Sequence, residues 1–199
     1  MKVKNYREGV IAEFFYVGAQ VTCWTFIIQY GTRVFLLEGM EEKEAEILSQ
    51  KYNIAAMVLF CLGRFVCTWI LKYVSAGRLL SVLAILAGVL VGGTVLFPDR
   101  NGLYCLVGVS ACMSLMFPTI YALALRGTGE NVKFAGAGLI MAILGGSVFP
   151  PLQALIIDAQ FQFAGLSSTN ISFLVPFLCF IVVALYGHRA YIRQFVLEA

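Results

Sequence analysis

Six long apolar segments follow one another along the chain, separated by shorter polar stretches. They cover residues 10–30, 53–73, 79–97, 102–125, 135–157 and 171–186. Most of them are close to the length of about 20 residues that an α-helix needs to cross a bilayer. A transmembrane β-barrel would instead require strands in which apolar and polar residues alternate. Residues 82–91 show no such alternation, so the pattern predicts an all-α membrane protein with six spanning helices.

The connections between these segments predict how the helices are arranged. Residues 74–78 and 98–101 form short turns, so the helices that they join must run antiparallel. The longest connection, residues 31–52, is acidic, and residues 41–50 have the composition of a short surface helix leading into the second segment. We therefore expect residues 1–199 to form a single six-helix domain with an acidic loop at 31–52.

Composition supports this interpretation and excludes several classes of protein. Hydrophobic residues make up 60% of the chain and charged residues 13%, whereas a soluble domain has roughly half and about a quarter. A soluble globular domain, a disordered segment and a nucleic-acid-binding protein are therefore excluded. The six cysteines lie in apolar segments without a Cys-x-x-Cys pair, and there is one histidine, so no disulfide framework, metal site or cofactor is expected.

The distribution of basic residues predicts the orientation in the membrane. If the N-terminus lies inside, the inner segments hold nine basic residues and the outer segments four, while the outer segments also hold seven of the eleven acids. Cytoplasmic loops are enriched in Lys and Arg. We therefore expect both termini in the cytoplasm, and the loop at 31–52 on the extracytoplasmic side.

Polar residues inside the first apolar segment are candidates for function, because polar groups are costly at membrane depth. Gln20 and Trp24 share a helix face, and Gln29 is expected close to that face. An amide pairs with sugar hydroxyls and an indole stacks on a sugar ring, so a sugar site is one interpretation. The alternative is that Gln20 bonds a neighbouring helix and Trp24 fills a gap. Glu13 is either a proton site or a carboxylate that reaches the membrane interface.

The second and fourth segments carry residues that predict structural or gating roles. Arg64 lies near the centre of its segment, where it must meet an acid, helix carbonyls or a water-filled cavity; no acid of this chain is as deep. Alternatively, the segment is longer than residues 53–73 and Arg64 lies nearer an interface. Pro118 must break a backbone hydrogen bond and kink its helix. Phe117 and Tyr121, one turn apart, form either an aromatic wall of a site or ordinary packing at the kink.

The fifth segment combines small residues with a proline. Gly138, Gly145 and Gly146 favour close contact with another helix, and Pro150 predicts a break near the outer end. A dinucleotide-binding loop is rejected, because no strand precedes these glycines. An enzyme is not expected either, since no nucleophile–base pair or metal cluster lies at membrane depth.

The order and spacing of several motifs resemble the C-terminal half of the L-fucose–proton symporter family of the major facilitator superfamily. The resemblance extends from about Glu13 to Tyr191. It is carried by Tyr16-Val-Gly-Ala-Gln20, Cys23-Trp24, Gly63-Arg64-Phe65, Thr68-Trp69, Met113-Ser114, Pro118-Thr-Ile120, Gly136-Ala-Gly138, Gly145-Gly146, Pro150 and Asp158.

This resemblance implies half of a twelve-helix transporter, with two inverted three-helix repeats and alternating access around a midplane sugar site. It implies a sugar and a proton as substrates, a bacterial cytoplasmic membrane as location, and proton-coupling carboxylates in an N-terminal half that this chain lacks. We therefore expect a sugar–proton symporter for L-fucose or a related hexose, completed by a second six-helix half. The residues expected to line the sugar path are Gln20, Trp24, Gln29, Phe117 and Tyr121.

Two alternatives stay open. The chain could be a truncated or split-gene membrane protein without transport activity of its own. It could also be a six-helix module that pairs with a second copy of itself.

Overall fold

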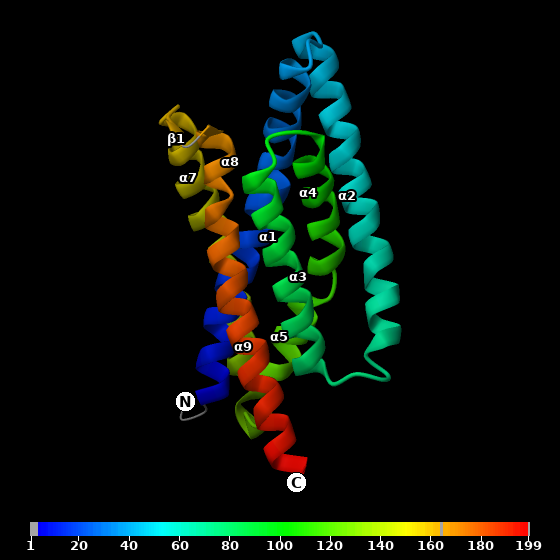
Figure 1. Ribbon diagram of the computed structural model, residues 1–199. Coiled ribbons are helices and arrows are strands. Elements are labelled where there is room, and N and C mark those ends of the chain that lie inside the picture. Colours follow the sequence, from blue (N-terminus) through cyan, green and yellow to red (C-terminus); the bar gives the residue numbers. More distant parts are fainter. Residues whose placement is uncertain (1–3, 164, 199) are drawn as a thin grey trace.

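The computed structural model describes residues 4–163 and 165–198, which form a bundle of long helices (Figure 1). Six helices within the described residues are long and apolar enough to cross a membrane, as the sequence predicts. They are Lys4–Leu37, Glu42–Ile70, Ala76–Leu96, Arg100–Leu125, Val132–Asp158 and Ser168–Arg193. Two strands of two residues each, β1 (Gln162–Phe163) and β2 (Leu166–Ser167), pair antiparallel between the last two spans.

The first three spans are continuous helices and the last three are interrupted. The continuous ones are α1 (Lys4–Leu37), α2 (Glu42–Ile70) and α3 (Ala76–Leu96). The fourth span consists of α4 (Arg100–Met113) and α5 (Met116–Leu125). The fifth follows the 3₁₀ turn η1 (Gly129–Asn131) and consists of α6 (Val132–Met141), the 3₁₀ turn η2 (Ala142–Leu144) and α7 (Gly145–Asp158). The sixth consists of α8 (Ser168–Ser172) and α9 (Leu174–Glu198).

Helix α1 is the centre of the bundle. It packs against α2, α4, α5, α7 and α9, and its buried face carries large side chains such as Tyr16, Tyr30 and Phe35. The two ends of the chain lie at the same end of the bundle (Figure 1), as an even number of spans requires.

The acidic connection is shorter than expected. Helix α1 continues to Leu37 and α2 begins at Glu42, so most of residues 31–52 is helical and the surface helix expected at 41–50 is the first part of α2. The extension is stable because Phe35 is buried and packs against Tyr52, and because Gly31 lies against Ser49. The two helices thus remain in contact beyond their apolar segments.

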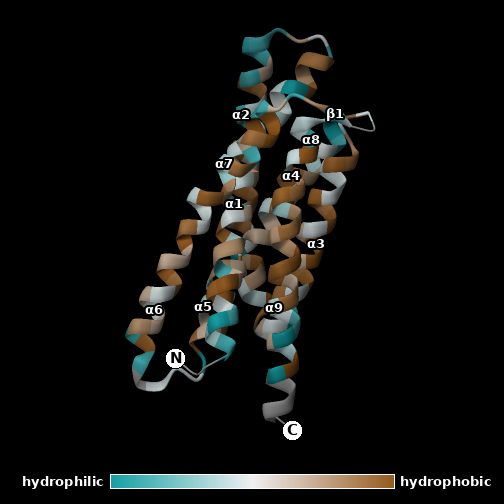
Figure 2. Ribbon diagram, turned by 90° about the vertical axis from the view of Figure 1, so that its left-hand side faces the viewer, coloured by the Kyte–Doolittle hydropathy of each residue, from teal (hydrophilic) through white to brown (hydrophobic). Residues whose placement is uncertain are grey.

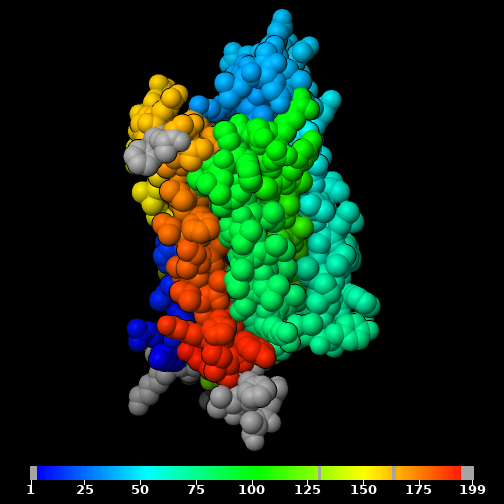
Figure 3. Space-filling model, viewed as in Figure 1, coloured from blue at the N-terminus to red at the C-terminus, as the bar shows by residue number. Residues whose placement is uncertain are grey.

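Two spans leave most of their apolar surface uncovered. In the most apolar part of α2 only 11% of residues are buried, and in Val132–Asp158 only 22%, against 61% in Arg100–Leu125. Large apolar side chains such as Phe65, Trp69 and Phe134 are exposed there. Hydrophilic residues gather mostly toward the two ends of the bundle (Figure 2), and α2 forms one side of the molecule (Figure 3). Such surfaces suit contact with lipid or another apolar bundle.

Candidate functional site

The break in the fourth span is the point around which the polar and aromatic candidates gather. Pro118 has no N–H, so it cannot donate to the carbonyl of Ser114 four residues earlier. The structure places the break one turn before Pro118, where Ser114 and Leu115 separate α4 from α5. In hydrocarbon a freed carbonyl needs another donor. Arg64 supplies it, because its Nε donates to the Ser114 carbonyl over 3.1 Å.

A second carbonyl at this break is also occupied by a side chain. The Tyr16 hydroxyl donates to the Met113 carbonyl at 2.8 Å, and Tyr16 is fully buried. The break is therefore held from α1 by a phenol and from α2 by a guanidinium.

Arg64 makes its remaining contact with an aromatic ring. Its guanidinium carbon lies 5.2 Å from the centre of the Phe60 ring, and no acid of the described chain forms an ion pair with it. Of the three partners considered for Arg64, the structure shows a helix carbonyl. Beside it lies an open hollow of about 600 Å³, lined by α2 alone through Cys61, Arg64, Phe65, Thr68, Trp69 and Lys72. Because one helix forms it, this hollow is a surface groove and not an enclosed site.

Trp24 joins three helices near this break. Its indole Nε1 donates to the Ser110 hydroxyl on α4 at 3.2 Å. Its ring meets Phe60 of α2 edge-on, with 4.9 Å between centroids. The side chain is half-buried, so part of the ring is accessible. Trp24 therefore fills a gap between helices and still presents an aromatic surface.

Phe117 and Tyr121 form the aromatic wall on α5. Their rings are stacked, with 6.4 Å between centroids and 12° between planes, and Phe117 lies 6.4 Å from the ring of Tyr16. Both are half-buried, beside the exposed Pro118 and Ala122. The Tyr121 hydroxyl lies 2.7 Å from the place that a Cβ on Gly136 would take, so it contacts α6.

The two glutamines do not lie together. Gln20 is half-buried and makes no side-chain hydrogen bond within the described residues, while Gln29 is exposed. Along the continuous helix α1, five residues rotate Gln29 about 140° away from Trp24. The expectation that Gln29 lies close to the Gln20–Trp24 face is therefore wrong. Gln29 instead shares an exposed stripe with Thr25.

The fifth span lies against α1 through its glycines. A Cβ on Gly145 would overlap the Phe14 carbonyl oxygen, and one on Gly146 would come within 2.9 Å of Val21. A Cβ on Gly138 would overlap the Tyr6 hydroxyl. These contacts are the close helix approach that the glycines predict.

The break in the fifth span does not coincide with its prolines. Pro150 lies inside α7, which continues to Asp158, and the interruption is the η2 turn that precedes α7. The expected break near the outer end is therefore displaced toward the middle of the span. Pro150 and Pro151 lie beyond the first turn of α7, so the carbonyls of Gly146 and Ser147 lose their helical donors although the helix continues.

Several residues of this arrangement are missed by sequence reasoning. Ser110, Phe60 and Tyr16 are ordinary residues of apolar segments, and only their contacts give them roles. One signal was available, since Ser114 stands four residues before Pro118 and its carbonyl must lose a partner. Within the described residues no group of three His, Cys, Asp or Glu side chains could hold a metal ion.

Relatives of known name match nearly the whole chain. An L-fucose-proton symporter of Haemophilus influenzae is 46% identical over 187 residues, covering 94% of this chain and 42% of that protein. An L-fucose-proton symporter of Escherichia coli is 31% identical, covering 94% and 40%. A glucose/galactose transporter of Brucella abortus is 30% identical, covering 90% and 40%. No family model matches.

A solved structure matches the fold. The crystal structure of the major facilitator superfamily transporter FucP in the outward conformation superposes with a TM-score of 0.83 at 30% identity. The match covers 96% of this chain and 43% of that protein, so the chain spans less than half the length of the relatives that it matches. The resemblance inferred from the motifs is confirmed. By sequence and by fold, the chain is homologous to one part of the L-fucose–proton symporters of the major facilitator superfamily.

Proposed function

We propose that the chain is the C-terminal six-helix half of a proton-coupled sugar transporter that takes L-fucose or a related hexose. The observation that carries the proposal is the match of 94% of this chain to 42% of a protein named L-fucose-proton symporter, together with six spans in the same fold as part of FucP. The complete transporter works by alternating access, with the sugar near the midplane between two halves. The matched proteins are transporters, so we assign no enzymatic activity.

The sugar path in this half follows the fourth-span break. Gln20 has an amide that is free of described partners, Trp24 offers part of its ring, and Phe117 and Tyr121 provide a stacked wall. Amides bind sugar hydroxyls and aromatic faces bind the apolar side of the sugar ring. Gln29 contributes from a separate, exposed face of α1. Arg64 and Pro118 shape the break and do not contact the sugar.

The partner is a second six-helix half. The uncovered apolar faces of α2 and Val132–Asp158 support this proposal, because a transporter half needs a large surface against which to rock. A second copy of the chain is the alternative partner, and a chain without transport activity is the alternative function. Blue-native electrophoresis after mild solubilisation distinguishes these cases, since a strictly monomeric, transport-inactive chain contradicts both assemblies.

The membrane orientation follows from the charges. We place the chain in the bacterial cytoplasmic membrane with both termini in the cytoplasm, because basic residues concentrate at the end of the bundle that holds both termini. The acidic segment at 31–52 then lies at the extracytoplasmic end.

The test uses the two tryptophans of the chain. In the assembled transporter, Trp24→Ala should abolish L-fucose uptake while the protein remains in the membrane at normal abundance. Trp69→Ala is the matched control, because Trp69 is the other tryptophan, is exposed on α2 and lies outside the proposed path. Uptake that survives Trp24→Ala excludes this residue from the site.

A further inference from the structure

A buried acid in α1 has no role in the arrangement described so far. Glu13 is 0% exposed, and neither of its carboxylate oxygens has a hydrogen-bond partner among the described residues. The sequence left open whether Glu13 reaches the membrane interface. Its complete burial within the bundle contradicts that interpretation.

An unpaired charge cannot be held in such a place without a large cost. Transferring an ionised carboxylate into an apolar interior without a partner is strongly unfavourable, and the group becomes neutral instead. No ion pair of the described chain includes Glu13. In this conformation the side chain is therefore a carboxylic acid that carries a proton.

A second buried group without a partner lies on α9, within electrostatic range of Glu13. The hydroxyl of Tyr186 on α9 is buried and makes no hydrogen bond in the described chain. It lies 3.1 Å from the position that a Cβ on Gly9 would take. Gly9 is one turn before Glu13, and side chains of a helix tilt toward its N-terminus. Ala124 fills the place of a Gly9 side chain, so the Tyr186 hydroxyl approaches α1 one turn before Glu13, in the direction in which the Glu13 side chain tilts.

Few other ionisable groups of the described chain lie within electrostatic range of Glu13 and Tyr186. The phenol of Tyr16, one turn further along α1, lies within electrostatic range of Glu13 but already donates to the Met113 carbonyl. On the α5 side, the residue that meets Gly9 is Ala124, which cannot ionise. The ionisable groups that act on Tyr186 are Glu8, Glu13, Arg126 and Arg193.

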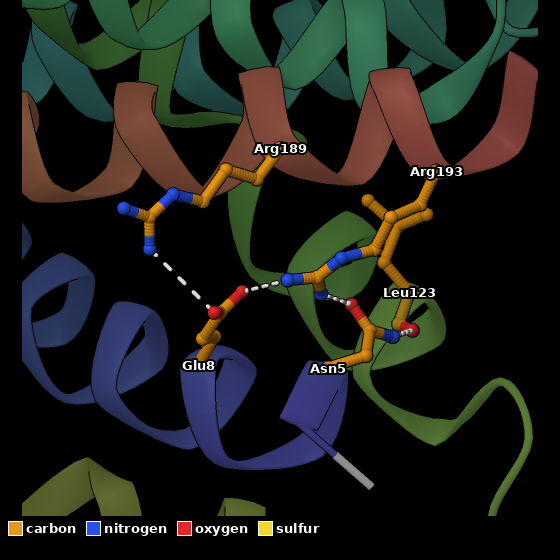
Figure 4. Close-up of polar contacts among 5 residues, drawn as sticks. All are labelled: Asn5, Glu8, Leu123, Arg189 and Arg193. Atoms are coloured by element: carbon orange, nitrogen blue, oxygen red, sulfur yellow. Dashed lines mark hydrogen bonds and ion pairs between the residues drawn. The ribbon is translucent and has the colours of Figure 1, made fainter. Parts of the chain in front are cut away.

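A polar cluster lies at the surface of the bundle, at the end that holds both termini. Glu8 lies between two arginines of α9, 3.5 Å from Arg189 and 2.5 Å from Arg193 (Figure 4). Arg193 also donates to the Asn5 side chain at 3.0 Å. An open hollow of about 340 Å³ is lined by Lys4, Glu8, Arg189, Ile192 and Arg193.

The spacing along α9 aligns three of these groups. Tyr186 precedes Arg189 by three residues and Arg193 by seven, so the three share one face of α9. On α1, Gly9 precedes Glu13 by about one turn, whereas Glu8 precedes Glu13 by five residues and lies about 140° around the helix. Tyr186 is therefore the group that stands between the two acids, since both Glu8 and Glu13 act on it electrostatically.

We propose that Glu13 is a proton-binding site of this half of the transporter, loaded from the end of the bundle where Glu8, Arg189 and Arg193 line the hollow. The carboxylate takes up one proton from solvent at that end, which forms one O–H bond, and the same bond breaks when the proton returns to solvent. A role in driving sugar uptake rests on the proposed symport, whereas proton binding by Glu13 does not.

Proton binding is tested on the chain in lipid nanodiscs by infrared difference spectroscopy over a pH titration. The wild-type chain should show the carbonyl stretch of a buried protonated carboxylic acid, and Glu13→Gln should lose that band. Gln is neutral and of the same shape, so the variant should remain folded, which thermal unfolding checks. Glu46→Gln is the control, since Glu46 is an exposed acid of α2 that lies outside this cluster, and it should retain the band. The same band in Glu13→Gln overturns the proposal.

Coupling is tested separately in the assembled transporter. Glu13→Gln should retain exchange of labelled for unlabelled L-fucose and lose uptake driven by a proton gradient. Gradient-driven uptake at the wild-type level refutes the coupling role. If the wild-type protein shows no sugar exchange at all, the proposed function fails, while the infrared measurement still decides whether Glu13 binds a proton.

Discussion

The fourth and fifth spans are both interrupted inside the bundle, yet they are held by opposite means. The fourth span is held by donors: Tyr16 and Arg64 occupy the carbonyls of Met113 and Ser114 at its break. The fifth is held by the absence of side chains, since Gly145 and Gly146 lie directly against α1. The break in the fourth span depends on hydrogen bonds, and the break in the fifth span depends on close contact between helix backbones.

The difference follows from the residues that make each break. In the fourth span Pro118 removes a donor in the middle of the bundle, and hydrocarbon offers no water to replace it. Arg64 then provides the donor for the Ser114 carbonyl, and Tyr16 donates to the neighbouring carbonyl of Met113. In the fifth span the chain passes through a 3₁₀ turn, and small residues allow the backbones to approach closely. Substitutions at the two breaks should therefore destabilise the protein by different mechanisms: loss of a hydrogen bond in the fourth span and a steric clash in the fifth.

The largest effect is expected at the tightest glycine. Gly145→Val places a branched side chain against the backbone of α1 at Phe14, and a helix backbone cannot shift locally as a flexible side chain can. We expect little or no folded protein in the membrane, measured as abundance after mild solubilisation and size-exclusion chromatography.

The control for this substitution is another glycine of a spanning helix. A Cβ on Gly92 would lie 3.6 Å from the Phe177 ring, which is ordinary van der Waals contact. Gly92→Ala should therefore leave abundance unchanged. Normal abundance of Gly145→Val would show that the fifth span does not depend on close contact with α1.

The next effect concerns the guanidinium at the fourth-span break. Arg64→Ala leaves the Ser114 carbonyl without its donor, and we expect the free energy of unfolding to fall by about 1.5–3 kcal/mol, as for hydrogen bonds to charged groups. Thermal or denaturant unfolding in detergent measures the change.

A double-mutant cycle gives this prediction its sharpest form. Pro118→Ala restores an N–H that can donate to Ser114 along the helix, so Arg64→Ala should cost less in that background. Equal costs in the two backgrounds would mean that Arg64 acts through its contact with the Phe60 ring and not through the carbonyl.

A smaller effect is expected from the neutral donor at the same break. Tyr16→Phe removes the hydrogen bond to the Met113 carbonyl and keeps the buried ring. Buried side-chain hydrogen bonds in membrane proteins contribute on average about 0.6 kcal/mol, so the loss of stability should be near that value and below the cost of Arg64→Ala. The same unfolding measurement applies. A loss as large as that of Arg64→Ala would show that the two donors act as one unit.

The fold was largely predictable from the sequence, because long apolar segments have one stable solution in a bilayer. The six spans and the antiparallel order followed from segment length and turn length alone. The end of α1 was not predicted, because residues 31–37 are held in a helix by tertiary contacts such as that of Phe35 with Tyr52 and not by their own composition.

The candidate site was predictable only in part. Pro118 and Arg64 were recognisable as exceptions, since each breaks a rule for residues at membrane depth. Their connection was not visible, because it depends on the angle at which α2 crosses the fourth span. The rotation of Gln29 away from Trp24 could have been predicted from the spacing of five residues along one helix. The partners of Trp24 and the complete burial of Glu13 could not, because they depend on how six helices pack.

The smallest effect is expected at the start of the fourth span, away from its break. Arg100 Nε donates to Glu38 at 2.7 Å, and this hydrogen bond holds the pKa of the Glu38 carboxyl below its ordinary value. A lowered pKa in the folded state stabilises the protein above the unfolded pKa of about 4.3, and this contribution is lost as pH falls through the folded value. Because the pair is exposed, Glu38→Gln at neutral pH should cost less than Tyr16→Phe, and the difference from wild type should vanish on acidification. A difference that persists in acid would mean that Glu38 acts through packing and not through its charge, which thermal unfolding of both proteins across this pH range would reveal.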